Sequence, residues 1–199
     1  MLAILGFVLA LARPTELTFV RHGETVANAT GHYNSKTLNA FSDKGASEVQ
    51  ALTQRLLAVP RFDRILVSPS PRVLRTIAPF LRASHQRATI WPLLYECCTG
   101  RRPKGAAPTA FTFGAKIEIP KDLLDLFVLE PAHNRLPVSS TYNAGLAQVD
   151  ASIAEFKQEF EGGRVLLVGH SGHGGHFLHA LTGKWKKLDN AVPVSLTLR

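Results

Sequence analysis

The 199-residue sequence is poor in sulfur, with two cysteines and one methionine. The two cysteines, Cys97 and Cys98, are adjacent. Adjacent cysteines can form only a strained disulfide, so the chain has no disulfide framework. Neither cysteine has a partner at the spacing of a zinc site. We therefore interpret the pair as two thiols at the end of a strand or in a loop.

Acidic residues are also scarce, because 15 Asp and Glu accompany 23 Lys and Arg and leave a net charge of +8. A basic chain favours anionic partners such as phosphorylated metabolites, nucleic acid or acidic membranes. The basic residues are scattered and do not alternate with aromatic residues as a base-stacking surface would require. We therefore expect a small phosphorylated substrate and no nucleic-acid partner, and the sequence does not indicate an oligomeric state.

No apolar run reaches the roughly 20 residues of a membrane-spanning helix, so we expect no stable membrane insertion. Residues 1–12 carry no charged side chain and end in Ala10-Leu11-Ala12, which resembles the cleavage site of a short secretory signal. No lysine or arginine precedes this segment, so residues 1–13 are either an apolar extension packed on the domain, which we favour, or a signal segment. The first alternative predicts a cytoplasmic protein, and the second a periplasmic or secreted one.

The remaining sequence alternates between two periodicities. Apolar and β-branched runs predict strands at 16–20, 63–67, 89–95, 165–168 and 194–198. Apolar residues at helical spacing predict helices at 42–58, 71–83, 142–160 and 174–181. This alternation predicts a single α/β domain over residues 14–199, with three α/β/α layers and a mostly parallel central sheet.

Residues 97–140 break the alternation. The beginning of this segment is rich in Pro, Gly and Ala, and its periodicity is weak until 121–129. We expect it to be an insertion over the C-terminal ends of the strands that serves as a lid or specificity wall.

Polar residues follow three of the predicted strands. Arg21, His22 and Gly23 follow the first, Ser68 to Arg72 follow the second, and Gly169 to Ser171 follow the fourth. Ligands bind outside the carboxyl ends of the strands in open α/β sheets, so these groups should meet. Arginine forks and glycine amides suit phosphate oxygens, and a histidine can attack phosphorus. Glu96, after the third strand, is the candidate general acid.

These motifs resemble those of the histidine phosphatase superfamily, the phosphoglycerate mutase-like group, in its branch 1. The matching stretches are Arg21-His22-Gly23-Glu24-Thr25 with Asn28, residues 38–45, Ser68-Pro69-x-x-Arg72, Glu96-x-x-x-Gly100, residues 168–172, and Asn190 with the last strand. The resemblance covers most of the chain between residues 16 and 198 and implies a phosphoglycerate mutase-like fold.

The resemblance also implies a role for each matching residue. His22 would become a phosphohistidine, while Arg21, Arg72 and His170 would hold the phosphoryl oxygens. Glu96 would protonate the leaving group and then help to deprotonate the attacking water. Gly23 and Asn28 would support the substrate pocket. No metal and no cofactor is expected, and inorganic phosphate would be the product.

The sequence departs from the family pattern at two points. The second histidine is usually flanked as Ser-His-Gly-Gly, whereas Ser171 follows His170 here, and it either donates a hydrogen bond to the phosphate or caps a helix. Asn39 stands near a position where the family often has an aspartate. The lid sequences of phosphoglycerate mutases are not found, so we predict a phosphatase. A phosphomutase and a non-catalytic module that binds phosphorylated ligands are the alternatives.

Other polar and aromatic clusters have two interpretations each. His170, His173, His176 and His179 recur every third residue, but each step turns a helix by about 300°, so a regular helix cannot gather them around one metal. His173 should be nearest the pocket.

The basic and aromatic residues near Glu96 also have two interpretations each. A basic group either meets a second anionic group of the substrate or lies in a solvated loop; its members are Arg101, Arg102 and Lys104. Trp91, Tyr95 and residues 111–113 form either a pocket wall or part of the core.

Overall fold

The computed structural model describes residues 13–98 and 112–198. The predictions for the N-terminal segment 1–12 and for Arg101, Arg102, Lys104 and Phe111 fall outside these residues. Within the described part of the chain, no helix is long and apolar enough to cross a lipid bilayer.

A six-stranded sheet in the order β4-β3-β2-β5-β1-β6 forms the centre of the molecule. Its strands are β1 (Thr15–Arg21), β2 (Arg64–Val67), β3 (Ala88–Ile90), β4 (Phe127–Val128), β5 (Gly163–Gly169) and β6 (Pro193–Leu198). Neighbouring strands run parallel except at β1 and β6, which pair antiparallel. The predicted mostly parallel sheet is therefore confirmed.

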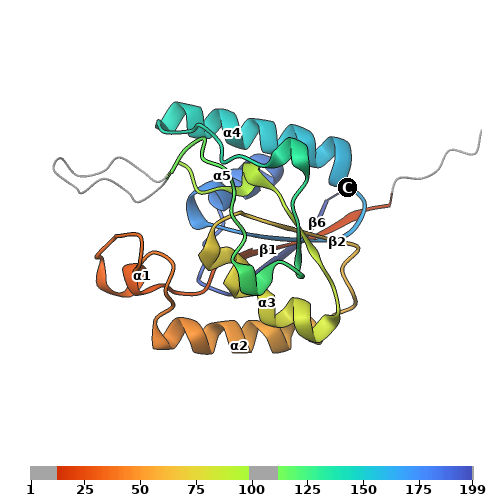
Figure 1. Cartoon of the computed structure of the whole chain (residues 1–199). Coiled ribbons are helices and arrows are strands. Elements are labelled where there is room, and N and C mark those ends of the chain that lie inside the picture. The colour runs from red at the N-terminus through yellow and green to blue at the C-terminus, as the bar shows by residue number, and fades with distance from the viewer. Residues whose placement is uncertain (1–12, 99–111, 199) are drawn as a thin grey trace, which may run out of the picture.

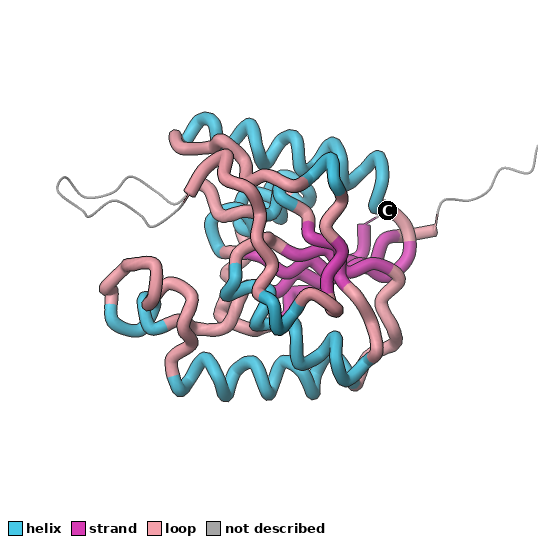
Figure 2. The backbone as a smooth tube through the Cα atoms, viewed as in Figure 1, coloured by secondary structure: helices cyan, strands magenta, loops and turns pink. Residues whose placement is uncertain are grey.

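Helices cover both faces of this sheet (Figure 1). The α-helices are α1 (Val26–Thr30), α2 (Asp43–Leu57), α3 (Pro71–Ser84), α4 (Tyr142–Glu155) and α5 (Ser171–Thr182). α2 and α3 lie on one face, and α4 and α5 lie on the other, with the strands between them (Figure 2). One buried apolar cluster lies around α2 and α3, and a second lies around α4 and α5. These layers confirm the predicted α/β/α architecture.

Four local features differ from the sequence-based expectations. β3 has three residues, because Pro92 cannot donate to the sheet and instead begins a 3₁₀ turn over Pro92–Leu94. β4 adds an edge strand beside β3 from within the expected insertion. α1, which follows the first polar motif, was not predicted. α5 begins at Ser171, three residues before the predicted start.

The helix α5 packs unusually close to β1. A Cβ atom at Gly174 would lie 2.3 Å from Cζ of Phe19 and 2.9 Å from Cδ1 of Leu188. The absence of a side chain at Gly174 therefore sets the distance between this helix and the sheet, and this distance positions the start of α5 beside the carboxyl end of β5.

Candidate active site

The carboxyl ends of β2, β5 and β1 lie side by side, because these strands are neighbours in the sheet. The chain continues from them into Ser68 to Arg72, His170, and Arg21 with His22, respectively. The backbone N–H of His22 donates to the carbonyl of Gly169 at 3.0 Å, which extends the β1–β5 pairing into the site. The sheet therefore brings together the residues that the sequence analysis expected to meet.

His22 is 4% exposed and is fixed by three hydrogen bonds, two to backbone carbonyls and one from a side-chain amide. Besides its bond to Gly169, its carbonyl accepts from Nδ2 of Asn190 at 2.7 Å. Its ring Nδ1 lies 2.8 Å from the carbonyl oxygen of Gly23. A carbonyl can only accept, so Nδ1 carries the proton and the lone pair of the neutral ring is on Nε2. Burial and then the charge of Arg72 hold the pKa of His22 well below its usual value of 6.5, which favours this neutral form.

His170 lies beside His22, with their ring centroids 5.3 Å apart. Its Nδ1 is 3.1 Å from Nη2 of Arg72, and its Nε2 is 2.8 Å from Oγ of Ser68. Arginine can only donate, so Nδ1 accepts from Arg72 and Nε2 donates to Ser68. Burial, followed by the charge of Arg72, lowers the pKa of His170 well below 6.5, so the ring is neutral. His170 therefore orients Arg72, and its contact with a phosphoryl group stays a prediction.

Two arginines supply positive charge at the site. Arg72, in the first turn of α3, is 3% exposed, and burial lowers its pKa to about 10, which leaves it cationic at neutral pH. Arg21 is half-buried, and its Nη1 donates to the carbonyl of Leu188 at 3.2 Å. Both charges act on His22 and His170, because they lower the pKa of each ring. The pair forms a cationic surface suited to phosphate oxygens.

Glu96 is 7% exposed and faces the N-terminus of α5. Its Oε1 accepts from the backbone N–H groups of His173 at 3.0 Å and of Cys97 at 3.2 Å. Burial raises the pKa of Glu96 above its usual value of 4.5, although the N–H donors and Arg72 act in the opposite direction. A carboxyl group with a raised pKa beside two arginines is suited to donate a proton.

The residues expected to support the substrate pocket have structural contacts of their own, and their role toward a substrate stays a prediction. The N–H of Gly23 donates to Oγ1 of Thr76 at 3.0 Å, so it does not face a ligand. A Cβ atom at Gly23 would lie 2.8 Å from Cγ2 of Val49, so this glycine makes space for α2. Asn28 accepts from the N–H and hydroxyl of Thr25, the N-cap of α1, and so completes the capping box of this helix. The N-cap of α5 is His170, so Ser171 is its first residue and not its cap.

Sequence reasoning gave no separate role to three buried hydroxyl residues. Ser68 and Ser70 both lie within hydrogen-bond distance of Nε2 of His170. Thr76 accepts from Gly23 and donates to the carbonyl of Arg72 at 2.7 Å, which links the β1 end to α3. The Ser-Pro-Ser run before α3 was visible in the sequence, but serines of this kind are common at helix starts, so the pattern alone did not indicate a contact with His170.

A pocket of about 360 Å³ opens beside Arg72 and Ser70. Leu38 and Asn39 line it together with residues 112, 115–118 and Leu136. The 97–140 segment therefore contributes a wall next to the site, while its residues 127–128 join the sheet. Of the expected aromatic residues, Tyr95 lines this pocket and Phe113 contacts the Tyr95 ring, whereas Trp91 is in the core against Phe160 and Phe177.

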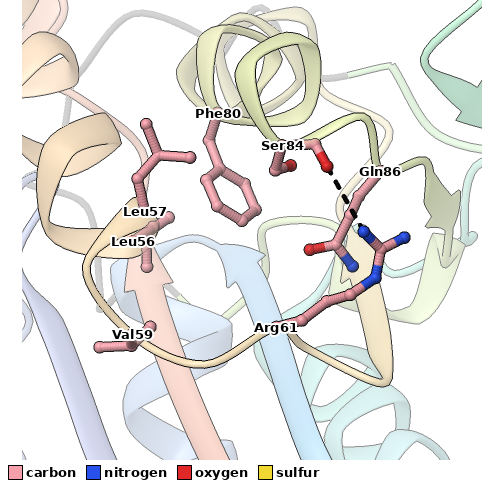
Figure 3. A pocket seen from close by; sticks show the side chains of 7 residues that line it. All are labelled: Leu56, Leu57, Val59, Arg61, Phe80, Ser84 and Gln86. Carbon is pink, nitrogen blue, oxygen red and sulfur yellow. Dashed lines mark hydrogen bonds between the residues drawn. The ribbon is translucent and has the colours of Figure 1, made fainter.

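A second pocket, of about 160 Å³, lies at the other ends of α2 and α3 (Figure 3). Leu56, Leu57, Val59 and Phe80 give it an apolar side, and Arg61 closes it by donating to the carbonyl of Ser84. It contains none of the residues predicted for the site. The two helices begin near the candidate site, and this pocket lies at their opposite ends. It is therefore remote from His22.

The remaining histidines of α5 diverge. The His173 side chain faces Ser152 on α4, with Nε2 and Oγ 3.1 Å apart, whereas its backbone N–H supports Glu96. His176 and His179 both pack on Trp185. Across residues 13–98 and 112–198, no group of three or more His, Cys, Asp or Glu side chains is placed to hold a metal ion.

Comparison with known proteins identifies the family. Residues 17–196 match the sequence model of the histidine phosphatase superfamily (branch 1). The chain belongs to this family. The expected resemblance is therefore confirmed, and the match includes every residue of the histidine phosphatase site described above. A search of curated proteins found no significant match.

Solved structures share the histidine phosphatase fold. A putative α-ribazole-5′-P phosphatase from Escherichia coli superposes with a TM-score of 0.64 at 20% identity, over 91% of this chain and 89% of that chain. The α-ribazole phosphatase from Shigella flexneri superposes with a TM-score of 0.63 at 23% identity, over 92% of this chain and 94% of that chain. The phosphoglycerate mutase from Bacillus anthracis superposes with a TM-score of 0.57 at 18% identity, over 94% of this chain and 89% of that chain. At these identities the likeness concerns the fold, which is phosphoglycerate mutase-like as expected.

Proposed function

We propose that this histidine phosphatase is a metal-independent phosphomonoester hydrolase that acts through a phosphohistidine on His22. One observation carries the proposal. The bond from Nδ1 of His22 to the Gly23 carbonyl leaves the Nε2 lone pair available on a neutral ring, beside two arginines. Such a ring can attack an electrophilic phosphorus atom whose charge the guanidinium groups compensate.

The reaction takes two steps. In the first, Nε2 of His22 bonds to phosphorus, the ester P–O bond breaks, and the leaving oxygen takes the proton of Glu96. In the second, water gives a proton to the Glu96 carboxylate as its oxygen bonds to phosphorus, and the P–N bond breaks to release inorganic phosphate. Arg21 and Arg72 bind the phosphoryl oxygens throughout and supply positive charge during the transfer.

The 360 Å³ pocket would receive the leaving group, because it adjoins Arg72. Its lining mixes apolar side chains such as Leu38 and Ile117 with polar ones such as Asn39 and Lys116. This size and mixture favour the phosphate ester of a small, partly polar alcohol.

The test is hydrolysis of an aryl phosphate in the presence of a chelator, with His22→Ala as the variant. We expect the wild type to release phosphate and to yield an acid-labile phosphoprotein after rapid quenching, and His22→Ala to do neither. Lys36→Ala, at an exposed site on the α1–α2 loop, is the control and should keep full activity.

Three results would contradict the proposal. Full activity of His22→Ala would rule out His22 as the nucleophile. Formation of an isomerised phosphoester in place of free phosphate would indicate a mutase. Binding of phosphate esters without turnover or a trapped phosphohistidine would indicate a non-catalytic module.

A further inference from the structure

Cys97 and Cys98 form a close pair of thiols directly after Glu96. Their Sγ atoms lie 2.7 Å apart, and both residues are free cysteines. Successive side chains of an extended chain point to opposite sides, so such a contact requires a turn. The backbone supplies it, because Cys98 has a φ of 58°, in the left-handed region that non-glycine residues rarely adopt.

Helix α4 packs against the pair and limits its movement. Sγ of Cys97 lies 3.4 Å from the carbonyl oxygen of Gly145. A Cβ atom at Gly145 would lie 2.8 Å from Sγ of Cys98 and 3.1 Å from Cβ of Cys97. The bare glycine therefore gives the two sulfur atoms the space in which they meet.

The two thiols differ in exposure and acidity. Cys97 is buried and Cys98 is half-buried, so a small reagent reaches Cys98 first. The hydrogen bond from Cys97 lowers the pKa of Cys98, and the same contact together with burial raises the pKa of Cys97. Cys98 is thus the more acidic thiol of the pair, and Cys97 is the thiol held next to it.

From this geometry we propose that Cys97 and Cys98 are a reversible oxidation site that a hydroperoxide converts into a vicinal disulfide. The Cys98 thiolate attacks the O–O bond and becomes a sulfenic acid, and the leaving oxygen is released as water or an alcohol. Cys97 then attacks the Cys98 sulfur, the S–O bond breaks, and a water molecule leaves with the Cys97 proton. The peroxide is the oxidant, and the two thiols lose two electrons and two protons.

The product would be a labile disulfide and not a structural one. Adjacent Cα atoms across a trans peptide are about 3.8 Å apart, which is shorter than the roughly 4.4–6.8 Å of ordinary disulfides. The peptide between the two residues is trans. Strain of this kind raises the reduction potential, so a dithiol reductant should reopen the bond.

Oxidation would also act on the proposed reaction, and this part rests on the proposed function. The N–H of Cys97 is one of the donors to Glu96. Ring closure restricts the backbone at Cys97, so this donor must move relative to the carboxyl group. We expect the oxidised protein to lose activity selectively toward esters with poor leaving groups, which need the proton of Glu96.

The first test is chemical and does not depend on activity. The intact protein is treated with hydrogen peroxide and digested, and the mass of the peptide that contains residues 97 and 98 is measured by mass spectrometry. We expect the mass to fall by two hydrogen atoms and to recover with dithiothreitol. Cys98→Ser should not form this product. Gly145→Ala should form it more slowly, because its methyl group displaces Sγ of Cys98 while both thiols remain. Oxidation to sulfinic acids, a disulfide-linked dimer, or no change in mass would each overturn the proposal.

The second test compares kcat/KM for an alkyl and an aryl phosphate before and after oxidation. A decrease of about tenfold in the alkyl-to-aryl ratio, reversed by dithiothreitol, is expected for a general acid that is disturbed but still present, because its complete removal costs about 10²–10⁴-fold. An unchanged ratio with a disulfide present would overturn the link to Glu96. If the reduced protein hydrolyses neither ester, the proposed function fails, while the mass measurement still decides whether the oxidation site exists.

Discussion

At the scale of single residues, the candidate site depends on which atoms carry protons. His22 and His170 are both buried and neutral, but they present opposite tautomers, because His22 donates from Nδ1 and His170 accepts at Nδ1. The carbonyl of Gly23 and the guanidinium of Arg72 impose this difference. The two rings are chemically identical, but His22 leaves Nε2 free to act as the proposed nucleophile, whereas His170 uses both ring nitrogens in hydrogen bonds to Arg72 and Ser68.

Arg72 should be irreplaceable by lysine. Lys lacks the planar fork, so Arg72→Lys would lose either the bond to His170 or a contact with the phosphoryl group. We expect kcat/KM to fall by about 10²–10³, as for removal of a donor that stabilises developing charge. Arg75→Lys, one turn along α3 in an exposed pair with Asp122, is the matched control and should stay near wild type. Equal losses in the two variants would indicate a general effect on α3.

The pH dependence of kcat/KM should report His22 and Glu96. The pKa of His22 is lowered, so the neutral nucleophile persists below pH 6.5, and the acid limb should lie below that value. The pKa of Glu96 is raised, so the protonated acid persists above pH 4.5, and the basic limb reports its loss.

Glu96→Gln separates these limbs. The kcat/KM of the variant should be lower, and its pH profile should lose the basic limb while it keeps the acid limb. The profile is measured with an alkyl phosphate across pH 4–9. A variant that keeps both limbs would assign the basic limb to another group, and the role of Glu96 would then be wrong.

At the scale of elements, two neighbouring glycines of α5 should respond in opposite ways. Gly174→Ala would place a methyl group 2.3 Å from the Phe19 ring, and overpacking of this kind costs about 1–3 kcal/mol. At Gly175 the nearest atom is 3.7 Å away on Trp185, so Gly175→Ala should gain up to about 1 kcal/mol from helix propensity. Urea unfolding of both variants measures the free energies, and similar changes in the two would mean that α5 does not pack as described.

The same elements show how far the sequence predicts the fold. Apolar runs located β1, β2, β5 and β6, and apolar residues at helical spacing located the four long helices. The runs are continuous in β1, β2 and β5 because these central strands are buried on both faces of the sheet. β4 has two residues, too few to carry a pattern, and its pairing with β3 depends on the tertiary fold. α1 is five residues long and is held by the capping box of Thr25 and Asn28, which apolar periodicity cannot reveal.

The site was predictable to a similar degree. The charged and imidazole groups follow strands, and the family motif fixes their order, so Arg21, His22, Arg72 and His170 were expected to meet. The role of Gly23 was not predictable, because the sequence does not show that its missing side chain faces Val49. The hydrogen bonds of Thr76 likewise depend on how α3 lies against β1.

At the scale of the whole molecule, buried histidines should make stability depend on pH. His22, His170 and His173 have lowered pKa values, that of His173 falling to about 3. Below pH 6.5 the unfolded chain therefore binds more protons than the folded one, and stability is lost as the pH falls. Each histidine lowers the free energy of unfolding by up to about 1.4 kcal/mol for every pH unit by which the pH falls between its unfolded and folded pKa values. Glu96, with its raised pKa, acts in the opposite direction but is a single group.

Urea unfolding between pH 7 and pH 4 tests this expectation. The free energy of unfolding should decline throughout this range, and His173→Gln should flatten the decline. Gln50→Ala, at an exposed site of α2, should leave the slope unchanged. A wild-type protein that is equally stable at pH 7 and pH 4 would mean that these histidines are accessible to protons in the folded state.

The pairing of β1 has a consequence for the way the protein is made. β1 is synthesised first, yet its two neighbours are β5 and β6, which are synthesised last. At about 5–20 residues per second, a ribosome needs on the order of ten seconds to produce residues 22–162 before β5 appears. During this interval His22, the proposed nucleophile, follows a strand that has no partner in the sheet. The proposed catalytic centre can therefore form only after β5 has been synthesised, and until then β1 lacks both of its neighbours in the sheet.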